Sequence, residues 1–321
     1  MRRYLVSRFA FMVVTVYAIA TILFFLLRVA PGDPTSRFVN EALPREDILA
    51  LRAAWGLEDA LHVQYLRYLR NLTLLEFGTS FTLREPVAPV LFDRIFNSVL
   101  LLTPALVLMT VLGVILGAAA GWRRGSRYEQ TIVFVSLLGR GMPTFFIGML
   151  VLMLFAYQRQ WLPAGGMTAP GELPGRVEML MSLDFWKRMI LPGVTIIATG
   201  IYGPMLLMRT SIIEVLGEDF LEVLKAKGLP GWRIAVHAAR NAMLPVITST
   251  AVTFAFIIDG QVIVEQIFSW PGAGRLIVQS MLDRDYPVLQ AAFFLVAVSV
   301  VVANLIADLL YGYLDPRVRY D

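Results

Sequence analysis

The sequence has no cysteine, little charge and no phosphate-binding loop. The absence of cysteine from its 321 residues excludes a disulfide framework and a thiolate metal site. Charged residues make up only 16% of the chain, and the basic ones form no stripe of the kind that nucleic acid requires. No GxxxxGK[ST] sequence occurs, so we expect no ATP to be bound by the usual backbone cradle.

The composition that remains is strongly apolar. Hydrophobic residues make up 57% of the chain, and the mean hydropathy of +0.67 lies far from the balance of a soluble globular domain. A helix needs about 20 apolar residues to cross the hydrocarbon core of a bilayer. Six runs approach or exceed this length, at residues 9–27, 95–122, 131–157, 189–208, 242–264 and 288–310. The sequence therefore predicts an all-α integral membrane protein with six transmembrane helices.

The first apolar run also has features of a signal peptide. Arg2, Arg3 and Arg8 precede it, and the AIA sequence at residues 18–20 resembles a cleavage site. The apolar residues continue well beyond that motif, so cleavage there would leave a hydrophobic end. We expect an uncleaved anchor.

Two local features stand out in the runs that follow. The third run contains Arg140 and Pro143, so we expect that helix to start at the membrane interface and to kink at the proline. Gly113 and Gly117 are four residues apart in the second run. Their spacing is typical of close packing between helices rather than of a functional site.

A polar segment, residues 31–94, separates the first two runs. The PGDP sequence at residues 31–34 is expected to end the first helix, because proline removes a backbone donor and restricts the residue before it. Two amphipathic helices are predicted at 43–57 and 60–75, and turns and extended chain at 78–89.

The polar side chains offer little for catalysis. His62 and His237 are expected on opposite sides of the membrane, so they cannot share one metal ion or one catalytic dyad. Asp33 and Glu41 could in principle form an acid pair, although a solvated loop is the commoner setting for such residues. We therefore expect this chain to be no enzyme and to hold no metal and no cofactor.

The distribution of basic residues predicts the orientation. The N-terminal segment, residues 123–127, the loop 214–241 and the C-terminal tail hold 12 Lys or Arg in roughly 50 residues, and the opposite segments hold about 13 in more than twice that length. By the positive-inside rule, both termini and the loop 214–241 are expected in the cytoplasm.

Residues 217–245 form the longest polar interruption in the second half of the chain, and they contain Lys225, Lys227, Arg233 and Arg240. Apolar residues recur through the segment at roughly helical spacing: Phe220, Leu221, Leu224, Trp232, Ile234 and Val236. A segment of this size cannot build a core of its own. We therefore interpret it as a docking element whose apolar side is covered by another subunit.

This docking element is predicted to be two short helices joined by an elbow. Glu218 or Asp219 is expected to cap the first helix, and Gly228 to end it in a left-handed conformation. The second helix is expected to run from Gly231 and to end at Pro245.

Three acidic residues fall within or next to the last two runs, where a charge in hydrocarbon costs at least about 2.5 kcal/mol. Glu265 and Asp308 are expected near the membrane interfaces, where this cost largely vanishes. Asp259 is deeper, and Thr253 and Gln261 are polar neighbours. These three residues either line a translocation path or make hydrogen bonds between helices.

Several motifs together resemble a known family. They are APGDP at 30–34, IEVLGEDF at 213–220, AKGL at 226–229, RNAMLP at 240–245, VIVEQIFSWPGAGRL at 262–276, DRDYPV at 283–288 and DPRVR at 315–319. In order and spacing they resemble the B-type permease subunits of bacterial dipeptide and oligopeptide ABC importers, including those for glutathione and nickel. Glu222, Gly228 and the Leu244-Pro245 pair are similar to the cytoplasmic E-A-A-x-x-x-G…L-P loop of such permeases, with Val223 and Leu224 in place of the two alanines.

The resemblance implies the permease fold of a type I ABC importer. Residues 1–30 would be the cytoplasmic N-terminus and first helix, and residues 31–94 an extracytoplasmic helical segment. Residues 95–321 would form the transmembrane domain of five helices, with a cytoplasmic coupling loop at 214–241. The coupling residues implied are Glu222, Val223, Leu224, Lys225, Lys227, Gly228, Leu229, Trp232, Arg233, Leu244 and Pro245.

The resemblance also implies partners in the bacterial plasma (inner) membrane. They are a second, C-type permease subunit, two ABC ATPase subunits that hold ATP and Mg²⁺, and a substrate-binding protein on the outer face at residues 31–94 and 270–287. The implied substrate is a dipeptide or oligopeptide. Nickel, glutathione or another small solute is the alternative within the family, and a structural membrane subunit without a path is the alternative outside it.

Overall fold

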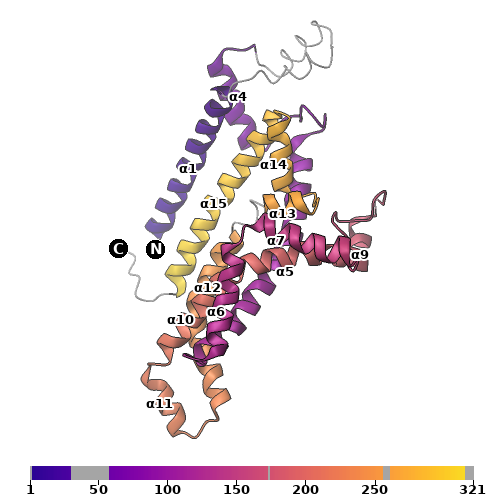
Figure 1. The fold of residues 1–321 in the computed structure, drawn as a ribbon. Helices are drawn as coiled ribbons and strands as arrows, with labels where there is room; N and C mark the ends of the chain where they lie inside the picture. The colour runs from indigo at the N-terminus through magenta and orange to yellow at the C-terminus, as the bar shows by residue number, and fades with distance from the viewer. Residues whose placement is uncertain (1, 30–57, 173, 256–260, 315–321) are drawn as a thin grey trace. The chain divides into compact units, whose positions relative to one another are not determined.

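The computed structural model describes residues 2–29, 58–172, 174–255 and 261–314, and within these every regular element is a helix (Figure 1). An isolated bridge pairs Thr79 with Pro86. The predicted all-α class is therefore confirmed for the described part of the chain. The elements are α1 (Arg2–Val29), α4 (Leu61–Thr73), α5 (Val87–Trp122), α6 (Arg127–Gly141), α7 (Thr144–Val151), the π-helix η1 (Leu152–Gln158), α8 (Arg176–Met181), α9 (Leu183–Gly200), α10 (Tyr202–Val215), α11 (Asp219–Ala226), α12 (Gly231–Ala255), α13 (Val262–Ile267), α14 (Ala273–Leu282) and α15 (Tyr286–Leu314).

Two of the described helices are long and apolar enough to cross a bilayer by themselves, α1 within Arg8–Leu26 and the 36-residue α5. Two bent pairs also qualify if each is counted as one span. These are α6 with α7 and η1, bent by 101°, and α9 with α10, bent by 44°. The described residues thus hold up to four spans by length and composition, and the count of six stays a prediction.

The third apolar run is two helices rather than one kinked helix. The break is at Pro143, as predicted, but the chain turns by 101° there. Met142 has φ −83° and ψ 138°, an extended conformation, because the proline ring disfavours helical geometry in the residue before it. The predicted bend at Pro143 is therefore confirmed in its position, and it separates two helices rather than kinking one.

The fifth apolar run corrects a second prediction about proline. The helix that starts at Gly231 does not end at Pro245 but continues as α12 to Ala255. Proline removes one backbone hydrogen bond, whereas ending the helix inside an apolar segment would leave several backbone groups unsatisfied. Helix α13 follows after residues 256–260, which lie outside the described residues.

The chain divides into two compact units, and each is considered by itself. The first contains the described parts of residues 1–96 and 276–305, and the second those of 97–275 and 306–319. Helix α4 in the first unit confirms the helix predicted at 60–75, whereas the one predicted at 43–57 lies outside the described residues.

Helix α4 packs on α1 in the first unit. The hydroxyls of Tyr65 and Thr21 are 2.7 Å apart, and the ring of Phe24 lies against those of Tyr65 and Tyr68. The turns predicted after α4 are present, but α5 already begins at Val87, inside the range predicted as turns and extended chain.

A buried carboxylate fixes these turns in the first unit. Asp285, at the start of α15, accepts hydrogen bonds from the Ser80 hydroxyl (2.5 Å) and from the backbone N–H groups of Phe81 (3.2 Å) and Thr82 (3.0 Å). It is 1% exposed.

In the second unit, α5 and α10 approach so closely that glycine is required on α5. A Cβ at Gly113 would lie 2.8 Å from Pro204 Cγ, and one at Gly117 would overlap the carbonyl oxygen of Met205. The predicted packing role of these two glycines is confirmed. Backbone contact of this kind lets helices associate in a membrane, where side chains gain little from leaving lipid.

Gly117→Ala is expected to destabilise the protein, because overpacking a close contact costs about 1–3 kcal/mol. Gly203→Ala, on α10, is the matched control, since nothing lies within 4 Å of its added Cβ. The measurement is the midpoint of thermal unfolding of the purified protein in detergent. Equal midpoints for the two variants would contradict the close approach of α5 and α10.

Candidate functional site

Helix α11 and the first turns of α12 form a helical hairpin at the end of α10, and Figure 1 shows α11 at the tip of the second unit, away from α7, α9 and α13. Glu218 occupies the N-cap position of α11, as predicted, but its side chain makes no capping hydrogen bond. Gly228 has φ +73°, so the predicted left-handed end of the helix is confirmed.

The inner face of this hairpin packs on its own chain. Leu221 of α11 and Ile234 of α12 are 2% and 5% exposed, and they join Met208 and Ile212 of α10 in one apolar cluster. The prediction that another subunit covers the whole apolar side is wrong for these residues. Their role is to hold α11 rigidly on α10 and α12.

The outer face of the hairpin is an exposed apolar patch formed by Val223, Trp232 and Val236, whose exposed fractions are 53%, 65% and 59%. The Arg233 guanidinium lies 5.2 Å from the centre of the Trp232 ring, within the range of a cation–π contact. The same hairpin also exposes three further basic residues: Lys225, Lys227 and Arg240. Its chemistry suits a protein partner that offers an apolar groove with acidic edges.

The residues predicted to couple to an ATPase are exposed, except Leu224 and Leu229, which are half-buried beside the α10–α12 cluster. Leu244 and Pro245 are exposed but lie twelve residues beyond Trp232 on α12, about 18 Å along the helix axis. The structure does not bring this pair into the patch.

The predicted path-lining residues are not brought together by any described contact. Thr253 is exposed and donates its hydroxyl to the carbonyl oxygen of Ser249 in its own helix (3.0 Å). Gln261 is exposed just before α13. Asp259 lies outside the described residues, so a path along this face stays a prediction.

The position of Glu265 near a membrane interface stays a prediction, but the side chain is not solvated as expected. Its side chain is 0% exposed and so does not lie in a solvated interface. The carboxylate accepts hydrogen bonds from the Ser98 hydroxyl (2.6 Å) and the Arg275 backbone N–H (2.9 Å). A Cβ on Gly272 would overlap this carboxylate, which shows how closely the chain folds over it.

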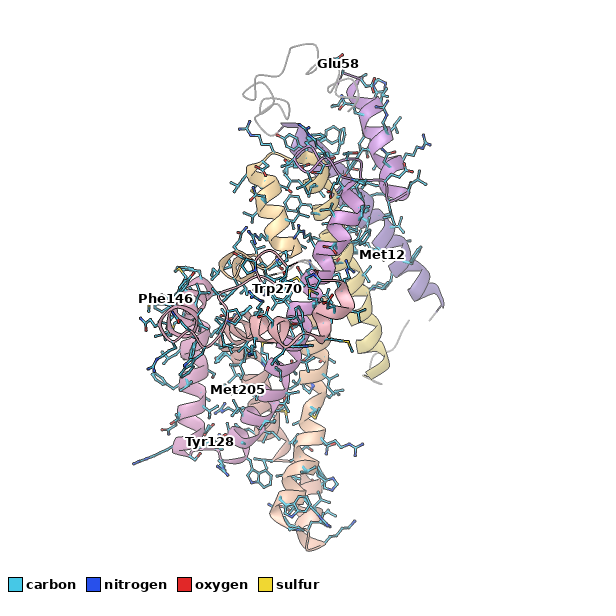
Figure 2. The ribbon with its side chains drawn as sticks, turned by 90° about the vertical axis from the view of Figure 1, so that its right-hand side faces the viewer. Met12, Glu58, Tyr128, Phe146, Met205 and Trp270 are labelled. Atoms are coloured by element: carbon cyan, nitrogen blue, oxygen red, sulfur yellow. The ribbon has the colours of Figure 1, made fainter. Side chains whose placement is uncertain are left out.

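The segment 270–274, expected to be a loop at the outer surface, is held against α5. The Trp270 indole donates to the carbonyl oxygen of Asn97 (2.8 Å), and the Asn97 amide donates to that of Pro271 (3.0 Å). Trp270 itself is completely buried (Figure 2). Sequence reasoning missed this cluster because its two halves lie more than 160 residues apart, and the motif at 262–276 does not indicate that its residues contact α5.

A polar cavity of about 160 Å³ lies in the first unit between α4 and the start of α15. The Tyr68 hydroxyl lines it and makes no hydrogen bond to a described residue. Burial, and to a lesser degree Tyr65, raises the pKa of Tyr68 to about 12.

Comparisons with known proteins place the whole chain among transport proteins. Residues 110–320 match the family described as "Binding-protein-dependent transport system inner membrane component", and residues 1–102 match the N-terminal region of such components. The oligopeptide transport system permease protein AppB of Bacillus subtilis is 33% identical, and the glutathione transport system permease protein GsiC of Salmonella paratyphi A is 31% identical. Both alignments cover 100% of this chain and 100% of the relative.

Glu265→Ala is expected to destabilise the second unit, because each buried donor left without an acceptor costs about 1–3 kcal/mol. Glu265→Gln should cost less, since its amide oxygen can still accept one of the two hydrogen bonds. Glu222→Ala, at an exposed position on α11, is the control. Thermal unfolding in detergent should give the highest midpoint for Glu222→Ala, a lower one for Glu265→Gln and the lowest for Glu265→Ala. An unchanged midpoint for Glu265→Ala would contradict the role assigned to this carboxylate.

Proposed function

Because this chain belongs to the inner-membrane components of binding-protein-dependent transport systems, we propose that it forms half of the translocation path of an ATP-driven peptide importer. It is a multi-pass permease subunit and not itself catalytic. The energy comes from two ABC ATPase subunits, which bind ATP and Mg²⁺. A homologous permease subunit completes the path, and a substrate-binding protein delivers the substrate.

The observation that carries this proposal is the two-faced hairpin of α11 and α12. Its inner face is fixed to α10 by Leu221 and Ile234, so a force on α11 reaches the long helices of the unit. Its outer face exposes Val223 and Trp232 beside basic residues. An aromatic residue and arginine in an exposed apolar patch are typical of a protein interface, and we assign this one to an ATPase.

The topology that we propose keeps six spans. They are α1, α5, α6 with α7 and η1, α9 with α10, α12 with α13, and α15. Both termini and the hairpin lie in the cytoplasm, which agrees with the density of basic residues.

The substrate-binding protein is assigned to the opposite, outer face. Since Trp270 and Ala273 are buried, the contact in the segment 270–287 is assigned to its exposed part, which contains Met281 and Leu282. Residues 31–94 supply the rest of this docking surface.

A short peptide is the substrate class that the relatives favour. One is named for oligopeptides and the other for glutathione, which is a tripeptide. These substrates share a peptide backbone with charged ends. The size and sequence of the peptide depend first on the binding protein.

Gly228→Val is expected to uncouple transport, because a β-branched residue at φ +73° is strained and would change the turn between α11 and α12. Gly231→Ala is the control, because Gly231 has the same open surroundings without a positive φ. With the complex reconstituted in proteoliposomes, peptide uptake should fall at least about tenfold for Gly228→Val, with the chain still inserted. Unchanged uptake and unchanged ATP hydrolysis would contradict the coupling role.

Purification of the tagged chain in mild detergent should also retain two ATPases and a second permease. ATP hydrolysis by this complex should rise when peptide-loaded binding protein is added. Stimulation by nickel-loaded binding protein instead would contradict the peptide assignment. The absence of any ATPase would favour a structural membrane subunit.

A further inference from the structure

Helix α6 begins with an almost buried carboxylate that is held by α10. The Glu129 side chain is 7% exposed, and its Oε1 accepts a hydrogen bond from Arg209 Nε (2.7 Å) and a second contact from the same guanidinium. The other carboxylate oxygen, Oε2, accepts the backbone N–H of Gly125 (2.5 Å). Glu129 thus joins α10 to the turn before α6.

Arg209 is closely connected to the hairpin of α11 and α12. Its neighbours Met208 and Ile212 belong to the cluster that holds Leu221 of α11. On another side, a Cβ at Gly121 of α5 would lie 2.8 Å from the Arg209 carbonyl oxygen. The position of Arg209 is therefore set by the same packing that fixes the hairpin.

Helix α6 packs on α9 as well as on α10, but few of its own side chains are buried in these contacts. Its buried side chains are those of Glu129 and Ser136, whereas large apolar residues along it are exposed: Phe134, Val135, Leu137 and Leu138. Near its far end, Gly139 lies against the carbonyl oxygen of Ala198 in α9. Figure 2 shows Tyr128, the neighbour of Glu129, at the end of the unit where α6 begins. The ion pair is therefore the polar anchor of α6 on α10.

We propose that the Glu129–Arg209 ion pair is a positioning contact of transport, which makes the start of α6 move as one body with α10 when an ATPase moves the hairpin. This inference rests on the proposed function. Helix α6 leads through the bend at Pro143 into α7 and η1. The pair thereby extends the movement of the hairpin to a second pair of helices that is not packed on α11.

Arg209→Met tests this role, since it removes the charge and keeps a long side chain. In proteoliposomes that contain the whole importer, the amount of peptide transported per ATP hydrolysed should fall about tenfold for Arg209→Met. Arg209→Lys should retain most of the wild-type ratio. Arg188→Met is the matched control. It removes another ion pair of the same unit, that with Asp184 of α9, together with the hydrogen bond from Arg188 to the Gly165 carbonyl oxygen (2.6 Å). Equal losses for Arg209→Met and Arg188→Met, or no loss for Arg209→Met, would overturn the proposal.

A distance measurement separates this contact from the proposed function. Because the chain has no cysteine, cysteines placed at the exposed positions Gln130 and Glu214 can carry two specific spin labels. With Arg209 intact, one narrow distance distribution is expected, in the isolated chain and in the nucleotide-trapped complex. With Arg209→Met, or with Glu129→Gln if that variant does not accumulate, the distribution should broaden.

An equally narrow distribution in the variant, or a wild-type distance that changes on nucleotide trapping, would overturn the proposal. If no ATPase binds the wild-type chain, the proposed function fails, and the measurement in the isolated chain still tests the contact.

Discussion

The backbone of α10 lies directly against α5 because glycines of α5 leave no side chain between the two helices. Gly113, Gly117 and Gly121 face α10 one turn apart, and a methyl group on any of them would meet atoms of α10 within 3 Å. Helix α12 and the hairpin then pack on the other faces of α10. The position of the exposed hairpin in the second unit thus depends on a contact that only glycine permits.

Buried carboxylates complete this arrangement. In the second unit, Glu265 ties the segment after α13 to α5, and Glu129 ties α6 to α10. In the first unit, Asp285 ties the turns before α5 to α15. Leaving a carboxylate unpaired away from water costs several kcal/mol, so each one strongly favours the arrangement that supplies its donors. In a membrane protein, whose helices gain little from excluding lipid, such contacts favour the pairing of particular segments.

Features that depend on local chemistry were predictable from the sequence. The apolar composition indicated a helical membrane protein, Gly228 indicated the end of α11, and Gly113 and Gly117 indicated close helix packing. The motifs between Ala30 and Arg319 indicated the transport family, which the comparisons confirmed. The break at Pro143 was predicted at the correct residue, but the 101° angle between the two helices was not predicted. A proline restricts the conformation of the residue before it without setting the angle between helices.

The sequence by itself determined the helical class, the family and the position of the exposed hairpin, since these follow from composition, short motifs and backbone preferences. Tertiary structure decided which side of the hairpin is open, that α12 continues through Pro245, and that Glu265 is buried. Each of these depends on partners far away in the chain, such as Ser98 for Glu265 or Met208 for Leu221. The free energy of burying a side chain is set by what surrounds it in space, and no local pattern contains that information.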